Sequence, residues 1–336
     1  MGGLLRLDNI ARKEVTTMRL AVSAVLILTL VCRAAEPAES QATAPAAAPA
    51  EQYGTEKGIF YLAEPESTAS EYAKERCRLD LYWPKDVKGF PTVVYYHGGG
   101  LTGGSRGLPA ALQKRGWAVV GAGYRLSPKV QHPVYIEDAA AALAWTFRHI
   151  ESYGGDPAKI FVTGISAGGY LTAMIGLDKS YLAAHGIDAN RIAGLIPVTG
   201  QMITHQTVRK EQGIEPSQLR PTIDRFAPLY HVRKDAPPAL FISGGWGVDM
   251  LMRAEENLYM VSMMKLVGHK AVQHVVIEGA NHGRCGKECW PYVIGFIEQC
   301  LQGQVKGTPP VTPGAAAPAP TAAPAPTVAP APVVAP

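Results

Sequence analysis

Apolar stretches of strand length alternate with helix-like patterns along most of the chain. The apolar stretches predict strands at residues 78–83, 92–97, 118–124, 160–164, 192–199, 239–243 and 272–278. The patterns between them predict helices at residues 107–115, 136–153, 167–177, 251–267 and 290–301. Strands that alternate with helices form a mainly parallel sheet with helices on both faces, so the expected fold class is α/β.

One segment interrupts this alternation. Residues 200–237 show no strand pattern, and polar or charged residues surround Thr204, His205 and Arg209. An insertion of this length within a compact domain is usually functional or disordered. We therefore expect about residues 200–237 to form a small lid over a functional site.

Proline and alanine dominate both flanks of this pattern. Residues 35–51 and 305–336 show no apolar periodicity, and such segments bury too little apolar surface to offset the entropy of ordering the chain. We expect a linker at residues 35–51 and a disordered tail at residues 305–336. One globular catalytic domain, with the lid insertion, is expected at residues 52–304.

The first 34 residues have the pattern of a signal peptide, whose true start is predicted at Met18. The apolar run at residues 21–31 is too short for a stable membrane anchor, and small residues after it allow cleavage after Ala34. We expect a secreted or periplasmic protein with no stable membrane span after cleavage. Lipoprotein anchoring at Cys32 is less favoured, because Val31 is bulkier than the residue that usually precedes such a cysteine.

The charge of the chain is mild, with a net charge of +4 and a pI near 8.7. Lysines and arginines are scattered among acids, whereas nucleic-acid-binding proteins gather them into patches. We therefore expect no nucleic-acid partner. The sequence does not define the oligomeric state.

Four cysteines follow the predicted cleavage site: Cys77, Cys285, Cys289 and Cys300. An even number in an exported protein permits disulfides, but their pairing cannot be read from sequence. A bridge between Cys285 and Cys289 would brace the segment after His282, and free or separately paired thiols are an equal alternative. Apart from His282, no further zinc ligands stand at a suitable spacing, so no metal site is expected.

The strongest chemical signal is the sequence Gly164-Ile165-Ser166-Ala167-Gly168, which follows a predicted strand and opens a predicted helix. This G-x-S-x-G context is typical of a nucleophile elbow, in which small residues tolerate a sharp turn around a strained serine. Ser166 would then stand at a helix N-terminus, where the helix dipole favours developing negative charge. We predict that Ser166 is a nucleophile.

A second signal is the run His97-Gly98-Gly99-Gly100 at the end of another predicted strand. Glycines there allow backbone N–H groups to approach a tetrahedral oxyanion, and the N–H of Ala167 would complete the hole. We predict an oxyanion hole formed by Gly98, Gly99 and Ala167.

A serine nucleophile needs a base, and the base needs an orienting carboxylate, in the chain order serine, acid, histidine. Both groups follow predicted strands: Asp249 comes after residues 239–243, and His282 comes after residues 272–278. We predict that Asp249 and His282 complete a catalytic triad with Ser166.

At this point the sequence resembles the α/β-hydrolase esterases related to hormone-sensitive lipase and the feruloyl-esterase-like carboxylesterases. The resemblance covers nearly all of residues 52–304 and rests on six short motifs. These motifs are His97 to Gly100, Gly121 to Pro128, Glu137 to Ala140, Gly154 to Pro157, Gly164 to Gly168, and Asn281 to Gly283. The resemblance implies a cofactor-free serine esterase that hydrolyses carboxylic esters through an acyl-enzyme on Ser166.

The sequence departs from the family pattern in two places. The approach to the acid, Gly244 to Asp249, is longer than the usual Gly-x-x-Asp, which leaves Glu255 and Glu256 as reserve candidates. Little folded chain precedes the first predicted strand, so the role of the helical cap found in hormone-sensitive-lipase-like enzymes passes to residues 200–237.

The substrates that we expect are small-molecule or polysaccharide-linked esters with short-chain or aromatic acyl groups. Export and the lack of a large cap fit acetyl or feruloyl groups on polysaccharide. His205, Arg209 and Trp246 are predicted to contact the substrate, and a solvated lid surface is the alternative role of the first two.

Two other functions share part of this pattern. A peptidase of the prolyl-oligopeptidase type shares the fold and the serine elbow, but its catalytic domain normally accompanies a large propeller domain, and the segment before residue 52 is too short for one. A catalytically inactive binding module would usually lack the serine or the histidine, whereas both are present here. An esterase is therefore the favoured prediction.

Overall fold

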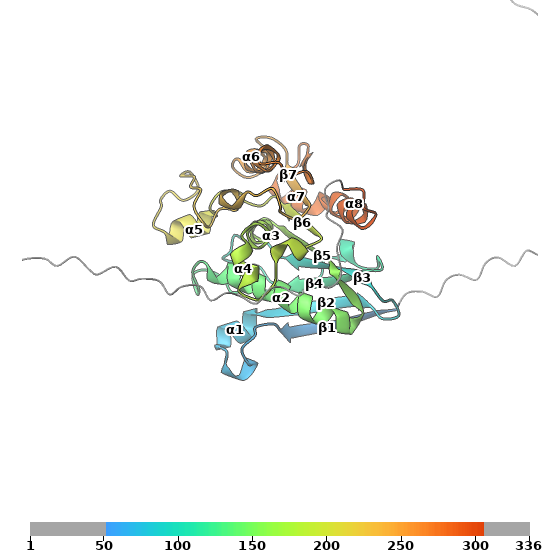
Figure 1. The fold of residues 1–336 in the computed structure, drawn as a ribbon. Coiled ribbons are helices and arrows are strands. Elements are labelled where there is room, and N and C mark those ends of the chain that lie inside the picture. Colours follow the sequence, from blue (N-terminus) through green and yellow to red (C-terminus); the bar gives the residue numbers. More distant parts are fainter. Residues whose placement is uncertain (1–51, 306–336) are drawn as a thin grey trace, which may run out of the picture. The chain divides into compact units, whose positions relative to one another are not determined.

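The computed structural model describes residues 52–305, and these contain one eight-stranded sheet with the strand order β1-β2-β4-β3-β5-β6-β7-β8 (Figure 1). The β1–β2 and β2–β4 pairs are antiparallel, and every later pair is parallel. The strands are β1 (Tyr53–Phe60), β2 (Arg78–Pro84), β3 (Phe90–Tyr96), β4 (Ala118–Ala122), β5 (Gly155–Ile165), β6 (Gly194–Val198), β7 (Ala239–Gly244) and β8 (Val272–Ile277). The predicted α/β class is confirmed.

Helices pack on this sheet and connect its strands. They are α1 (Glu71–Arg76), α2 (Val134–Tyr153), α3 (Ala167–Leu177), α4 (Lys179–Ala183), α5 (Gln206–Glu211), α6 (Arg253–Leu266), α7 (His282–Glu288) and α8 (Trp290–Leu301). Because side chains alternate along each strand, neighbouring residues face opposite layers. In β3, Val94 belongs to the buried cluster that includes α2 and α3, whereas Val93 belongs to the cluster that includes α8.

All seven predicted strands form, and the structure adds β1 in front of them. This strand lies at the edge of the sheet, paired antiparallel with β2, and only one of its eight residues is fully buried. Edge strands commonly carry charged side chains, here Glu56 and Lys57, and therefore lack a clear apolar alternation. The strand was missed for that reason.

The helix predicted at residues 107–115 is wrong, because only the short 3-10 turn Ala110–Leu112 forms there. Pro109 is extended in front of that turn, with φ −57° and ψ 122°, and Lys114 after it has a positive φ of 57°. Neither conformation belongs to an α-helix. The segment is therefore a loop closed by one tight turn.

Residues 200–237 contain α5 and the 3-10 turn Pro228–His231 and no strand, as predicted. Hydrogen bonds attach this insertion to the rest of the domain: Thr207 Oγ1 donates to the carbonyl of Gly100 at 2.6 Å, and the Tyr170 hydroxyl donates to the carbonyl of Phe226 at 2.7 Å. The insertion is thus fixed next to the glycine-rich loop. Its role as a lid stays a prediction.

The predicted signal peptide, the proline- and alanine-rich linker up to residue 51, and the tail from residue 306 lie outside the described residues. Within residues 52–305, no helix is long and apolar enough to cross a membrane. Cys77, Cys285, Cys289 and Cys300 are free, so the alternative with a Cys285–Cys289 bridge is not formed. Instead, Cys289 Sγ donates to the carbonyl of Gly286 at 3.4 Å.

Candidate active site

The predicted chemical groups meet at one edge of the sheet, where neighbouring parallel strands end. Ser166 follows β5, Thr199 follows β6, Asp249 lies beyond β7, and His282 lies beyond β8. The carboxyl ends of parallel strands meet at the same edge, which is where open α/β sheets usually bind ligands. Residues far apart in the sequence are therefore brought together.

The backbone of Ser166 is strained, with φ 59° and ψ −116°, between the end of β5 and the start of α3. A non-glycine residue adopts a positive φ only where the surrounding structure holds it there. The turn is tight enough that a Cβ on Gly164 or Gly168 would overlap the backbone, including the carbonyl of Tyr96. The two glycines are therefore a packing requirement of this turn.

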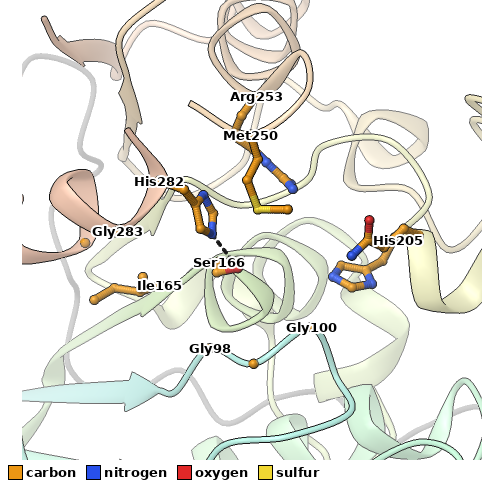
Figure 2. A pocket seen from close by; sticks show the side chains of 12 residues that line it. Gly98, Gly100, Ile165, Ser166, His205, Met250, Arg253, His282 and Gly283 are labelled. Carbon is orange, nitrogen blue, oxygen red and sulfur yellow. Dashed lines mark hydrogen bonds between the residues drawn. The ribbon is translucent and has the colours of Figure 1, made fainter. Parts of the chain in front are cut away.

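His282 connects Ser166 to Asp249. Its Nε2 lies 2.9 Å from Ser166 Oγ, and its Nδ1 lies 2.8 Å from Asp249 Oδ1 (Figure 2). When Nδ1–H donates to the carboxylate, Nε2 is left as an acceptor for the serine hydroxyl. His282 was expected in a loop, but it is the first residue of α7. The Asn281 side chain caps this helix by accepting from the N–H of Arg284 at 2.9 Å.

The Asp249 carboxylate accepts three further hydrogen bonds. Thr199 Oγ1 donates to Oδ2 at 2.7 Å, the N–H of Gly244 donates to Oδ2 at 2.8 Å, and the N–H of Met250 donates to Oδ1 at 2.7 Å. Burial alone would raise the pKa of Asp249, but the hydrogen bonds from His282, Thr199 and the two N–H groups outweigh it and leave the pKa lowered. The longer approach to Asp249 therefore does not prevent it from reaching the histidine.

The reserve acids do not occupy this position. Glu256 Oε2 instead accepts from the N–H of Met202 at 2.9 Å, and Glu255 lines a neighbouring cavity. Thr199 also belongs to the site, because its Oγ1 lies 3.0 Å from His282 Nδ1 and donates to Asp249. The sequence did not predict this residue. A threonine after a strand carries no local signal, so only the fold reveals its contacts.

The glycine-rich loop lies directly beside Ser166. A Cβ on Gly98 would be 2.9 Å from the carbonyl oxygen of Ile165 and 3.3 Å from Ser166 Cβ. Gly99 has a φ of 114°, and a Cβ there would overlap the carbonyl of Gly103. Side chains are thus excluded at both positions, which leaves the backbone as the surface that faces Ser166.

His97 supports this loop from behind. Its ring stacks on Tyr124 with centroids 4.3 Å apart, and its Nδ1 lies 2.7 Å from the carbonyl of Gly98. The Tyr124 hydroxyl donates to the carbonyl of His97 at 2.7 Å. Burial lowers the pKa of His97 to about 4, so the ring is neutral near pH 7 and serves to hold the loop.

A cavity of about 540 Å³ opens at Ser166. Figure 2 shows Met250 and Arg253 entering it from the side opposite Gly98 and Gly100, with His205 at its far end. Its walls are formed by Gly98, Gly99, Gly100, Ile165, Ser166, His205, Gln206, Met250, Arg253, His282, Gly283 and Gly286. This space is large enough for a small ester.

The three residues predicted to contact substrate fall in different places. His205 lines the cavity, is almost fully buried and is the N-cap of α5, where its Nδ1 accepts from the N–H of Thr207 at 3.2 Å. Arg209 is buried and lines an adjoining cavity. Trp246 lines neither, since its half-exposed ring packs edge-on against His274 with centroids 6.2 Å apart. The structure therefore does not bring Trp246 to the site.

No group of three or more His, Cys, Asp or Glu side chains that could hold a metal ion occurs among residues 52–305. The chemistry available at the site is that of a hydroxyl, an imidazole and a carboxylate in one hydrogen-bonded chain, next to backbone N–H groups.

The sheet order and its helical layers define an α/β-hydrolase fold, which solved structures of esterases share. A structure described as a truncated carbohydrate esterase from gut microbiota superposes with a TM-score of 0.60 at 19% identity, over 77% of this chain and 99% of the other. Esterase 2 of Thermogutta terrifontis superposes with a TM-score of 0.56 at 23% identity, over 77% of this chain and 95% of the other. At sequence identities this low, the structural likeness establishes the fold alone.

The chain belongs to the BD-FAE family, whose profile matches residues 79–256, more than half of the sequence. Esterase LipC of Mycobacterium tuberculosis is 29% identical over 229 residues, which are 61% of this chain and 56% of the relative. Carboxylesterase NlhH of the same organism is 42% identical over 101 residues, which are 28% of this chain and 32% of the relative. The chain therefore aligns with only about half of the length of LipC and with a third of NlhH.

Proposed function

We propose that this protein is an exported serine carboxylesterase that acts through an acyl-enzyme on Ser166. His282 is the general base and acid, Asp249 orients it, and the backbone N–H groups of Gly98, Gly99 and Ala167 form the oxyanion hole. The substrates are short-chain or aromatic carboxylic esters, including acetyl or feruloyl groups on polysaccharide. No cofactor is needed for this chemistry.

The observation that carries the proposal is the continuous chain of hydrogen bonds from Ser166 Oγ through both nitrogens of His282 to Asp249, with distances of 2.9 Å and 2.8 Å. Nucleophile, base and orienting acid within hydrogen-bonding distance are the geometric signature of an activated serine. An inactive binding module would have no need to keep this arrangement at the mouth of a cavity.

The catalytic cycle follows from these contacts. His282 Nε2 takes the proton of Ser166 as Oγ attacks the ester carbonyl, and the resulting imidazolium returns that proton to the leaving alcohol. Water then repeats the sequence on the acyl-enzyme and releases the acid. The Asp249 carboxylate, whose pKa is lowered by its hydrogen bonds, stays ionised near neutral pH and stabilises the imidazolium in both steps.

The oxyanion is stabilised by backbone dipoles whose positions are fixed before the reaction. The N–H of Ala167 is the first of α3, and the first N–H groups of a helix have no partner within the helix. The loop at Gly98 and Gly99 is held by the buried His97 ring. Such preorganised donors are typically worth about 3 kcal/mol each in the transition state.

Support for ester substrates comes from the relatives, which are named esterases and a carboxylesterase, and from a solved neighbour titled as a carbohydrate esterase. The cavity of about 540 Å³ accommodates a small acyl group together with part of an alcohol. Small or flat apolar groups fit against its glycines, Ile165 and Met250, while other parts of its wall are polar.

A panel of esters tests this proposal. The purified protein is expected to hydrolyse p-nitrophenyl acetate and butyrate, with falling rates on long-chain esters, and to release acetate from acetylated xylan or ferulate from methyl ferulate. Peptide p-nitroanilides serve as the control for a prolyl-oligopeptidase-like activity and should not be cleaved. Hydrolysis of the anilides alone would contradict the esterase proposal and favour a peptidase.

A further inference from the structure

A second cavity, of about 410 Å³, adjoins the one at Ser166 and shares Gln206, Met250 and Arg253 with it. Its outer walls are apolar and largely exposed: Leu219, Ile223, Leu251, Met252 and Tyr259. Its inner wall is different in character, because it contains the buried charged side chains of Arg209, Arg253 and Glu256. The two cavities therefore meet at Arg253.

Arg253 is the first residue of α6 and is only 4% exposed. Within residues 52–305 its guanidinium makes no hydrogen bond, and its Nε is buried without a partner. Figure 2 shows the side chain directed into the cavity beside Met250. A buried N–H group with no hydrogen-bond acceptor is costly, and arginine does not escape this cost by losing its proton.

The neighbouring charged side chains do not form ion pairs with Arg253 among residues 52–305. Arg209 is 1% exposed, donates through Nη1 to the carbonyl of Arg220, and also has a buried Nε without a partner. The carboxylate of Glu256, which is 8% exposed, accepts from the N–H of Met202 at 2.9 Å and makes no ion pair with either arginine in the described part of the chain. Asp249 is already engaged by His282 and Thr199.

Arg253 therefore lies in the field of two carboxylates, Glu256 and Asp249, and of a second guanidinium, Arg209. Burial raises the pKa of Glu256, whereas Arg253, the backbone N–H group of Met202 and Arg209 act to lower it. Within the residues that the structure describes, neither carboxylate forms an ion pair with Arg253, so its guanidinium stays available to an anion that enters the cavity. The guanidinium fork matches the geometry of a carboxylate, with which it forms paired hydrogen bonds.

We propose that Arg253, with Arg209 behind it, binds a carboxylate carried by the ester substrate. The carboxylate belongs to a group that extends from the reacting carbonyl at Ser166 into the junction of the two cavities. This inference rests on the proposed esterase function and narrows it to esters that carry a negative charge, such as half-esters of dicarboxylic acids or esters of hydroxy acids. The apolar walls of the second cavity then surround the remainder of the same molecule.

Two matched pairs of esters test the inference with the whole protein. One pair is para-acetoxybenzoate and para-acetoxybenzamide, which places the charge on the leaving alcohol. The other is monomethyl glutarate and its amide, methyl glutaramate, which places the charge on the acyl group. In at least one pair, kcat/KM is expected to be about 10- to 100-fold higher for the carboxylate, the factor that one charge-assisted hydrogen-bonded pair supplies.

Variants locate the effect. Arg253→Gln should reduce the ratio of kcat/KM between carboxylate and amide to about one, and Arg253→Lys should leave an intermediate ratio because it keeps the charge without the fork. Lys265→Gln is the control, since it removes the same charge from the exposed C-terminal end of the same helix and should keep the wild-type ratio.

Direct binding provides a measurement that requires no variant. Calorimetric titration of the wild type with glutarate and para-hydroxybenzoate should give at least one Kd about 10-fold or more below that of the corresponding amide. Equal rates within both ester pairs, together with equal binding of acids and amides, would overturn the inference while leaving the esterase function intact. Failure to hydrolyse any of the four esters, with preferential binding of the acids retained, would instead contradict the proposed function.

Discussion

Ser166→Ala is expected to lower kcat for p-nitrophenyl butyrate by at least about 10⁴-fold, because the variant has no oxygen with which to form an acyl-enzyme. The residual rate would come from the oxyanion hole and from binding alone. The change removes one small hydroxyl from a turn whose geometry is fixed by Gly164 and Gly168, so the fold should be retained. Initial rates under saturating substrate, with thermal unfolding measured in parallel, check both statements.

Ser152→Ala is the matched control for this variant. Ser152 lies on the exposed surface of α2, where its hydroxyl donates to the carbonyl of His149, and its loss should leave kcat unchanged. If Ser166→Ala kept more than about a hundredth of the wild-type kcat, the hydroxyl of Ser166 would not be the nucleophile.

Asp249→Asn should have the second largest effect, a loss of about 10⁴-fold in kcat. The asparagine keeps the shape of the side chain but can turn its amide toward His282 Nδ1, which would place the imidazole proton on Nε2 and remove the acceptor that Ser166 needs. The negative charge that stabilises the imidazolium is also lost. Steady-state kinetics on the same ester measure the loss, and an unchanged melting temperature would exclude unfolding as its cause.

Thr199→Val provides a graded comparison. It removes the 2.7 Å hydrogen bond that Asp249 accepts from Thr199. The charge of Asp249 and the shape of the side chain at position 199 are kept. The expected loss in kcat is about 10-fold, the lower part of the range for a hydrogen bond to a charged group. A loss from Glu256→Gln larger than that from Asp249→Asn would assign the role of the acid to Glu256 instead.

The fold could be predicted from local pattern where strands are buried on both faces. The strand at residues 239–243 and the helix at residues 290–301 coincide closely with β7 and α8, because continuous apolar runs and a wide apolar stripe leave few alternatives. The polar edge strand β1 has no continuous apolar run, and the short helix α5 has no wide apolar stripe, so neither could be predicted. Their formation depends on pairing with β2 and on contacts with distant loops.

The candidate site could be predicted where its geometry is local. The turn at Ser166 needs glycines at fixed positions, and the loop at Gly98 needs them for close backbone approach, so both are visible as motifs. Thr199 and Arg253 carry no such signal, because their importance comes from contacts across strands and across the cavity. Trp246 shows the opposite error, since a position near Asp249 in sequence does not bring its side chain into the cavity.

The methionines of α6 illustrate the same limit. Met260 and Met264 are buried in the core. Met252, one residue before the helix, is 61% exposed and lines the second cavity instead. Met252 is the N-cap of α6, and its left-handed backbone, with φ 56°, lies outside the helix. Spacing alone could not separate these residues, because the helix boundary decides which of them face the core.

Covalent trapping tests the central claim most directly. The protein is treated with a fluorophosphonate, which reacts with serines activated by a hydrogen-bonded histidine, and the intact mass and the modified peptide are determined by mass spectrometry. We predict one adduct per chain, located on Ser166, with complete loss of esterase activity and no adduct in Ser166→Ala. An unmodified, correctly folded wild-type protein, or an adduct on a different residue, would contradict the account.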